Sequence, residues 1–255
     1  MSKVLRQFSI LALFVLASAC TQSSGFDSNG EPATLHSYSV RGNSLLQPDA
    51  LASDRAIWTR FTQVIPARHR PEIAVFETID GNSGVDGALY PQDPDSKRIW
   101  VLQLDGTGSV SASDLDRTMV HEFAHLVTLR ASQIPVSHLD DGAARAACRT
   151  YYDDYGCTTN TSYLNRFVQQ FWTGLLPVES GGNAISDRYR RHRDQFVTEY
   201  AATNPSEDIA ESFAEYVLRS TLPTGDSVAN QKILFLAKYP ELAALRRSIR
   251  ASAGF

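Results

Sequence analysis

The stretch from residue 113 to about residue 130 constrains the fold more than any other part of the chain. Its apolar residues recur at helical spacing and would line one side of a helix: Leu115, Met119, Phe123 and Leu126. Ser113 or Asp114 can begin this helix, and a strongly apolar strand is predicted directly before it, over residues 99–104. The sequence therefore predicts a buried strand that leads into an amphipathic helix.

Helical and strand patterns outside this stretch predict an α+β fold. A helix over residues 53–65 and a strand over residues 72–79 precede the central strand and helix. Further helical patterns follow at about residues 162–174, 186–201, 205–217, 227–238 and 240–251. We therefore expect a small mixed or antiparallel sheet and a helical C-terminal half.

The central helix contains the motif His121-Glu122-Phe123-Ala124-His125. Residues four apart lie on the same face of a helix, so both imidazoles can reach one ion. Zn²⁺ accepts histidine nitrogen and is usually tetrahedral, which leaves room for a water molecule. Glu122 lies beside the first histidine, where it can take a proton from metal-bound water. The alternative interpretation is a pair of helical histidines in a polar core, without a metal.

A third ligand is required, because two histidines do not complete a zinc site. The extended pattern with a glycine and a third histidine is absent, since Thr128 and Ala131 occupy those positions. The other histidines are candidates only by elimination or lie too far upstream: His138 and His192 in the first group, His36 and His69 in the second.

The helix that starts at Asn204-Pro205 contains two glutamates that share one face, Glu207 and Glu211. One of them could ligate the ion while the other accepts the second ring N–H of a ligating histidine. Together with Glu215 they could equally form a solvated acidic stripe. The spacing alone leaves these alternatives open.

The two motifs together resemble the gluzincins, zinc peptidases whose metal is bound by both HExxH histidines and a glutamate from a following helix. In particular, they resemble the family of the anthrax lethal factor catalytic domain and the minimal gluzincin domains like it. That family has a His-Glu-Phe-x-His helix and a downstream Tyr-x6-Glu-x3-Glu segment, which here is Tyr200, Glu207 and Glu211. The resemblance covers roughly residues 50–130 and 186–220.

The resemblance implies a zincin-like metallopeptidase that hydrolyses peptide bonds in a protein or peptide substrate. Glu122 would be the general base, and Tyr200 would donate a hydroxyl hydrogen bond near the oxyanion. Glu211 would be the carboxylate behind a ligating imidazole. The resemblance implies three ligands to Zn²⁺: His121, His125 and Glu207.

One departure from the family concerns length. The separation between His125 and Glu207 is longer than in compact members, so residues 131–185 are interpreted as an insertion. Two other functions stay open: a zinc-binding but catalytically silent envelope lipoprotein that acts as a binding module, and an interaction protein without a metal. An intact Glu122 favours the enzyme, because zinc binding does not require that base.

The first twenty residues have the layout of an export signal. Lys3 and Arg6 precede an apolar stretch over residues 8–17, which is too short to span a bilayer of ~30 Å. The ending Ala17-Ser18-Ala19-Cys20 resembles a bacterial lipobox, in which Cys20 is lipidated, although it also suits an ordinary signal peptidase. We therefore expect a protein of the bacterial cell envelope, anchored by lipid to the membrane or otherwise periplasmic or secreted.

The segment over residues 21–49 is rich in small and polar residues and is predicted to be a flexible linker. The metallopeptidase domain is then expected over residues 50–255. Nucleic-acid binding is not expected, because the net charge is −4 and the basic residues form no concentrated patch.

Cys148 and Cys157 lie nine positions apart within the expected insertion. In an oxidising compartment they are expected to form a disulfide that closes a short loop. The alternative is two buried free thiols. A zinc role is not expected, because neither cysteine is part of a CxxC pattern.

Overall fold

The computed structural model describes residues 31–178 and 183–255. The predicted export signal over residues 1–20, including Cys20, lies outside the described residues. Within the described part of the chain, no helix combines the length and apolar character needed to cross a bilayer.

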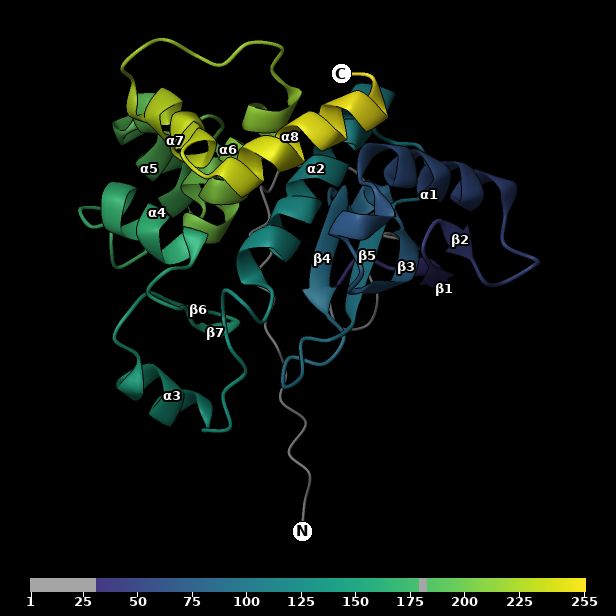
Figure 1. Cartoon of the computed structure of the whole chain (residues 1–255), viewed down its shortest axis with the longest axis horizontal. Coiled ribbons are helices and arrows are strands. Elements are labelled where there is room, and N and C mark those ends of the chain that lie inside the picture. Colours follow the sequence, from purple (N-terminus) through teal and green to yellow (C-terminus); the bar gives the residue numbers. More distant parts are fainter. Residues whose placement is uncertain (1–30, 179–182) are drawn as a thin grey trace.

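A five-stranded mixed sheet forms one layer of the molecule (Figure 1). Its strand order is β2-β1-β3-β5-β4, with β3 and β5 parallel and the other neighbours antiparallel. The sheet therefore agrees with the predicted small mixed sheet. The strand bounds are Thr34–Arg41 for β1, Ser44–Leu45 for β2, Ile73–Ile79 for β3, Gly87–Pro91 for β4 and Trp100–Asp105 for β5.

The prediction of a flexible linker over residues 21–49 is wrong for the part that forms β1 and β2. In β1, Tyr38 lies opposite Phe76 of β3, and Tyr38 and Val40 are buried. The remaining residues of this strand are exposed, so the apolar signal is confined to two side chains. A half-exposed strand of this kind resembles a polar linker when only the sequence is read.

The edge strand β4 lies in a stretch for which the sequence predicts no strand. It pairs antiparallel with β5, and Leu89 and Pro91 are its buried residues. Proline is tolerated here because an edge strand leaves one row of backbone groups unpaired. The short strand with glycine and proline at its ends gives little strand signal in the sequence.

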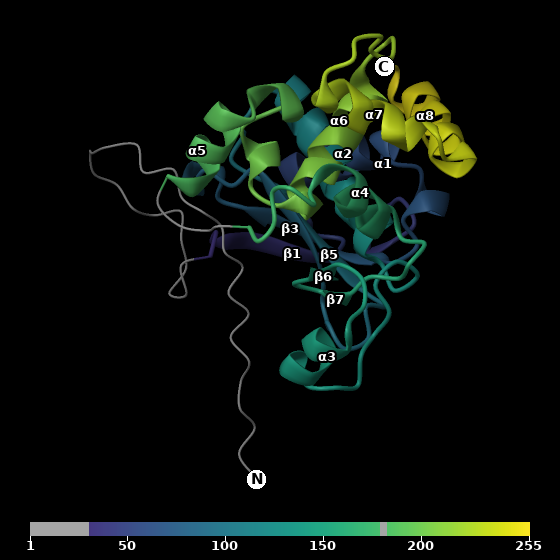
Figure 2. The same cartoon turned by 90° about the vertical axis from the view of Figure 1, so that its left-hand side faces the viewer.

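Eight α-helices of the described residues complete the fold. Figure 2 shows that α1, α2 and α4–α8 lie on one side of the sheet. Their positions agree with an α+β fold whose C-terminal half is helical. The helix bounds are Ala52–Val64 for α1, Ala112–Leu129 for α2, Asp141–Ala147 for α3, Tyr163–Phe171 for α4, Ala184–Arg191 for α5, Pro205–Leu218 for α6, Val228–Ala237 for α7 and Pro240–Ala253 for α8.

The helix α2 lies between the sheet and the C-terminal helices. It contacts β4 and β5 on one side and α6 on the other. Every residue from Met119 to Leu129 is consequently buried. Ser111 caps the helix by accepting a hydrogen bond from the Asp114 backbone N–H, so α2 begins slightly before the predicted start. This placement puts the middle of α2 inside the molecule.

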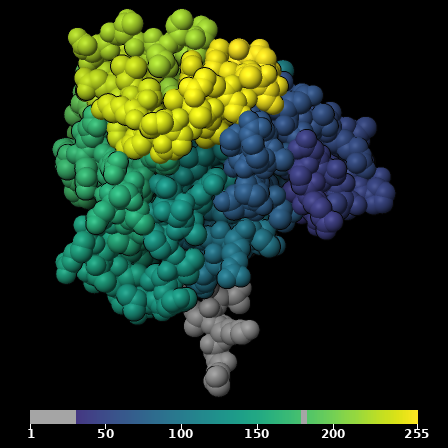
Figure 3. Space-filling view, viewed as in Figure 1, coloured from purple at the N-terminus to yellow at the C-terminus, as the bar shows by residue number. Residues whose placement is uncertain are grey.

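The C-terminal helix α8 closes the helical layer. Figure 3 shows α8, in yellow, alongside the α1 region, in blue, and the two helices are in contact. Arg246 of α8 donates to the carbonyl oxygen of Tyr216 at 2.6 Å, and Arg250 donates to that of Val217 at 2.8 Å. These bonds satisfy carbonyl groups at the C-terminal end of α6, which have no partner within the helix.

The expected insertion contains a small disulfide-closed unit. Cys148 and Cys157 are joined by a disulfide, as the sequence predicts. Between them, the two-residue strands β6 (Tyr152–Asp153) and β7 (Gly156–Cys157) form a hairpin that contacts α3 (Figure 1). Directly after this hairpin, the Thr159 backbone N–H donates to the carbonyl oxygen of Gln133, which lies shortly after the end of α2, at 2.9 Å.

Candidate metal centre

The helix α2 presents the histidines of the motif on one face. His121 and His125 are 6% and 8% exposed, and their ring centroids lie 4.9 Å apart. Their Nε2 atoms are separated by 3.2 Å. This arrangement follows from the four-residue spacing, which places both side chains one helical turn apart.

A third candidate ligand atom comes from the first turn of α6. The Glu207 Oε2 atom lies 3.1 Å from Nε2 of His121 and 3.4 Å from Nε2 of His125. The turn is fixed by Asn204, whose side chain accepts a hydrogen bond from the Glu207 backbone N–H at 2.9 Å, and by Pro205 at the start of the helix. Two nitrogens and one carboxylate oxygen therefore converge from two helices, in a group able to hold a metal ion.

The chemistry of these three atoms fits a cation. His121 Nδ1 lies 2.7 Å from the Glu211 carboxylate, to which it donates its proton, so Nε2 of the neutral ring carries a lone pair. That lone pair faces another imidazole nitrogen and a carboxylate oxygen, and only a proton or a metal ion can relieve the repulsion between them. The two Nε2 atoms and the Glu207 Oε2 atom are separated from one another by 3.1, 3.2 and 3.4 Å. These distances match the spacing of ~3.3 Å between ligand atoms around tetrahedral zinc with bonds of ~2.0–2.1 Å.

Glu211 lies behind the ring of His121 rather than among the three converging atoms. Its second oxygen accepts hydrogen bonds from Arg117 and from the Thr198 hydroxyl, each at 2.8 Å. Burial alone would raise the pKa of Glu211, but the hydrogen bonds with His121 and Arg117 hold that pKa at about 2. The position agrees with the supporting role that the family resemblance implies for Glu211, and it leaves Glu207 as the third candidate ligand.

Glu122 is buried next to His121 on α2, but it is not one of the three residues whose ligand atoms converge. Burial raises the pKa of its carboxyl group. Gly87 of β4 lies close to it, because a Cβ atom built on that glycine would be 3.3 Å from Glu122 Cγ. A carboxylate whose pKa is raised and which stays outside the ligand set is suited to proton transfer.

Tyr200 lies in the short 3₁₀ helix Tyr200–Ala202, shortly before α6. Its ring centroid is 5.7 Å from that of His121, and the side chain is 55% exposed. The charge of Glu207 raises the pKa of the Tyr200 hydroxyl well above its usual value. The hydroxyl therefore keeps its proton and can donate a hydrogen bond at the mouth of the site.

The surrounding carboxylates favour positive charge on the two imidazoles. Burial lowers the pKa of His121, but hydrogen bonds with Glu207 and Glu211 outweigh it and raise that pKa well above its usual value. Burial also lowers the pKa of His125, and the charge of Glu207 reverses the effect. The site therefore stabilises added positive charge, as a cation-binding site must.

Three other residues of the site were not predicted from the sequence. Arg117 lies one turn before His121 on α2, so helical spacing could have identified it. Thr198 and Gly87 reach the site only through tertiary packing, and no local pattern marks them. The site is therefore larger than the two motifs.

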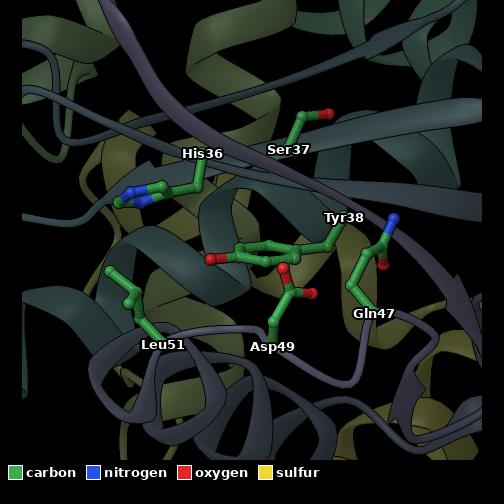
Figure 4. A pocket seen from close by; sticks show the side chains of 6 residues that line it. All are labelled: His36, Ser37, Tyr38, Gln47, Asp49 and Leu51. Atoms are coloured by element: carbon green, nitrogen blue, oxygen red, sulfur yellow. The ribbon is translucent and has the colours of Figure 1, made fainter.

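The remaining histidines lie elsewhere. His138 is exposed, His192 contacts Gln195, and His69 lies 3.1 Å from the hydroxyl of Ser248. His36 lines a surface pocket of about 250 Å³ on β1, where its ring and that of Tyr38 lie on one side of the strand and Ser37 on the other (Figure 4). The buried carboxylate of Asp54 lies 2.9 Å from Nδ1 of His36, which ties α1 to β1. None of these four histidines reaches the convergence of His121, His125 and Glu207.

Comparisons with protein-family models, with curated proteins and with solved structures find no match to this chain. Function therefore has to be inferred from the geometry of α2 and α6. That geometry combines three potential metal ligands, a separate buried carboxylate and a tyrosine hydroxyl.

Proposed function

We propose that the protein is an exported zinc peptidase of the gluzincin type with a zincin-like fold. In this proposal His121, His125 and Glu207 hold Zn²⁺. The observation that supports it most is the convergence of their three ligand atoms beside the buried carboxylate of Glu122, which stays outside the ligand set. A site that only stored zinc would not require that extra carboxylate.

The residues of the chain have distinct tasks in this mechanism. Bound zinc would supply the Lewis acidity that lowers the pKa of a water molecule to around 7. Glu122 accepts a proton from the attacking water on its carboxylate and then transfers it to the departing amide nitrogen. Tyr200 donates a hydrogen bond to the carbonyl oxygen as negative charge develops on it. Glu211 keeps the proton of His121 on Nδ1 and so fixes the orientation of the ring.

The neighbouring sheet edge supports a polypeptide as the substrate. β4 is the last strand of the sheet, so its outer row of backbone groups lacks a partner strand within the described residues. Gly87 brings this strand against Glu122. A peptide in extended conformation can add to such an edge through backbone hydrogen bonds, which would place a peptide bond next to the base.

The export part of the proposal depends on the N-terminal pattern and on the cysteines. The pairing of Cys148 with Cys157 agrees with an oxidising compartment. Anchoring through lipidated Cys20 is proposed from the lipobox-like sequence alone.

The proposal is tested by comparing purified wild-type protein with the Glu122→Gln variant. Both are expected to bind one zinc ion per chain, because the substitution leaves the three ligands in place. Cleavage of casein should fall by about 10²–10⁴-fold in the variant, the usual effect of removing a general base. His121→Ala should lose the zinc, whereas His138→Ala, at an exposed position, should match the wild type.

Each result separates one alternative from the others. Zinc binding without any Glu122-dependent cleavage would leave a silent zinc-binding module. Wild-type protein without zinc would favour an interaction protein in which these residues form a polar core.

A further inference from the structure

The disulfide-closed hairpin carries a buried carboxylate that the proposed mechanism does not use. Asp153, on β6, is 6% exposed. Its Oδ1 atom accepts a hydrogen bond from the Tyr155 backbone N–H at 3.1 Å, and its Oδ2 atom accepts one from the Ser206 hydroxyl. Ser206 directly precedes Glu207 in the first turn of α6. Asp153 therefore connects the hairpin to the turn that presents the third candidate ligand.

The candidate ligand His125 lacks a hydrogen-bond partner on its second ring nitrogen within the described residues. Nδ1 of His121 has Glu211 as its acceptor, whereas Nδ1 of His125 is buried without a partner among the described residues. Burial raises the pKa of Asp153, and the charge of His125 acts on that pKa in the opposite direction. Ligating histidines usually have such a carboxylate or carbonyl group on their second nitrogen.

The hairpin is held in a fixed position. The disulfide closes its ends, and the backbone N–H of Thr158 donates to the carbonyl of Tyr151 at 3.0 Å. Lys97, buried beneath it, donates to the carbonyl oxygen of Tyr155 at 2.6 Å and to that of Ile134 at 3.0 Å. Opening the disulfide would give residues 148–157 more freedom and would loosen the attachment of Asp153.

We propose that Asp153 is a positioning residue for the metal centre, held in place by the Cys148–Cys157 disulfide. It fixes the turn of α6 that carries Glu207 and adds negative charge beside that turn. This inference rests on the proposed zinc site. It assigns a role to the expected insertion, which otherwise would only be a surface addition.

The test measures Zn²⁺ affinity by competition with a chromophoric chelator. Asp153→Asn keeps the side-chain shape but removes the charge, and it should weaken zinc binding by about 10–100-fold. Ser206→Ala keeps the charge but loses the hydrogen bond to α6, and it should weaken binding by a smaller factor. Wild-type protein in a non-chelating phosphine reductant should lose affinity to the level of the Cys148→Ser/Cys157→Ser variant.

A matched control separates positioning from general loss of stability. Asp54 is also a buried carboxylate, 2% exposed, and accepts a hydrogen bond from the Tyr38 hydroxyl at 2.6 Å, but it lies on α1. Asp54→Asn should leave zinc affinity unchanged. The absorption spectrum of the Co²⁺-substituted protein should change in Asp153→Asn and not in Asp54→Asn.

The outcomes distinguish this inference from the proposed function. Wild-type affinity and an unchanged Co²⁺ spectrum in both Asp153→Asn and Ser206→Ala would overturn the positioning role and leave the zinc site intact. If Asp153→Asn does not fold, the Ser206→Ala result decides. Absence of zinc binding by the wild-type protein would remove the proposed function and this inference together.

Discussion

The two ring nitrogens of His121 face different partners, and this difference organises the site. Nδ1 lies 2.7 Å from Glu211, and Nε2 lies 3.1 Å from Glu207. The two glutamates are one helical turn apart on α6, so they reach opposite ends of one imidazole. Their spacing could be read from the sequence, but which of them faces Nε2 depends on how α6 is rotated against α2.

The role of Glu211 can be tested with a neighbour as control. Glu211→Gln removes the charge that holds the proton on His121 Nδ1, so zinc affinity should fall by about 10–100-fold in a chelator competition. Glu215 also binds Arg117, at 2.6 Å, yet it does not contact His121. Glu215→Gln should therefore retain wild-type affinity, and an equal loss in both variants would contradict the assigned role of Glu211.

The pH dependence of stability follows from the raised pKa values of His121 and His125. A histidine whose folded pKa is raised stabilises the fold fully below its unfolded pKa of ~6.5, and this contribution is lost as pH rises through the folded pKa. Metal-free protein should thus lose thermal stability from about pH 6.5 upward. Zinc binding instead requires unprotonated imidazoles and strengthens over the same range.

The measurement is the melting temperature between pH 6 and pH 8, with excess zinc and after metal removal. The gap between the two melting temperatures should widen as pH rises. A gap that stays constant or narrows would show that the two histidines do not exchange protons for the metal.

At the scale of elements, α6 is held by a buried ion pair beside the candidate ligand Glu207. Asp208 and Lys232 of α7 are both fully buried, with 2.6 Å between Oδ2 and Nζ. Trp172 also donates to Asp208, at 2.7 Å, and the Lys232 ammonium lies 4.1 Å from the centroid of the Phe196 ring. These contacts fix the helix face that points Glu207 toward α2.

Breaking this ion pair should destabilise the protein more than replacing it. Asp208→Asn leaves the Lys232 ammonium buried without its partner, and the free energy of unfolding should fall by about 3–5 kcal/mol. The double variant Asp208→Asn/Lys232→Met removes both charges and should recover much of the loss. Denaturant titration measures the free energy of unfolding of both variants. A double variant that is no more stable than Asp208→Asn would show that the buried ion pair does not hold α6 in this way.

The sequence predicts elements well where the apolar pattern is strong and poorly at the edges of the sheet. The buried helices α2 and α6 and the inner strand β5 lie close to their predicted positions, because apolar residues recur along their buried faces at the period of each element. β1 and β4 were missed, because an edge or half-exposed strand buries few side chains. The link between Asp153 and Ser206 spans 53 residues, so no local pattern could have predicted it.

At the scale of the whole molecule, the site joins two halves of the chain. His121 lies on a helix packed against the sheet, and Glu207, 86 residues later, lies in the helical C-terminal part. The four-residue spacing predicts the histidine pair by itself, whereas the approach of α6 needs the complete fold. A metal bound here would therefore fasten the helical part to the sheet and α2.

In the proposed function, one zinc ion binds between α2 and α6. Anomalous diffraction at the zinc absorption edge, from crystals of the zinc-loaded protein, would locate this ion. We expect a single strong peak ~2.0–2.2 Å from Nε2 of His121, Nε2 of His125 and a carboxylate oxygen of Glu207. A zinc ion ligated by Glu211 in place of Glu207, or the absence of any peak between these helices, would contradict it.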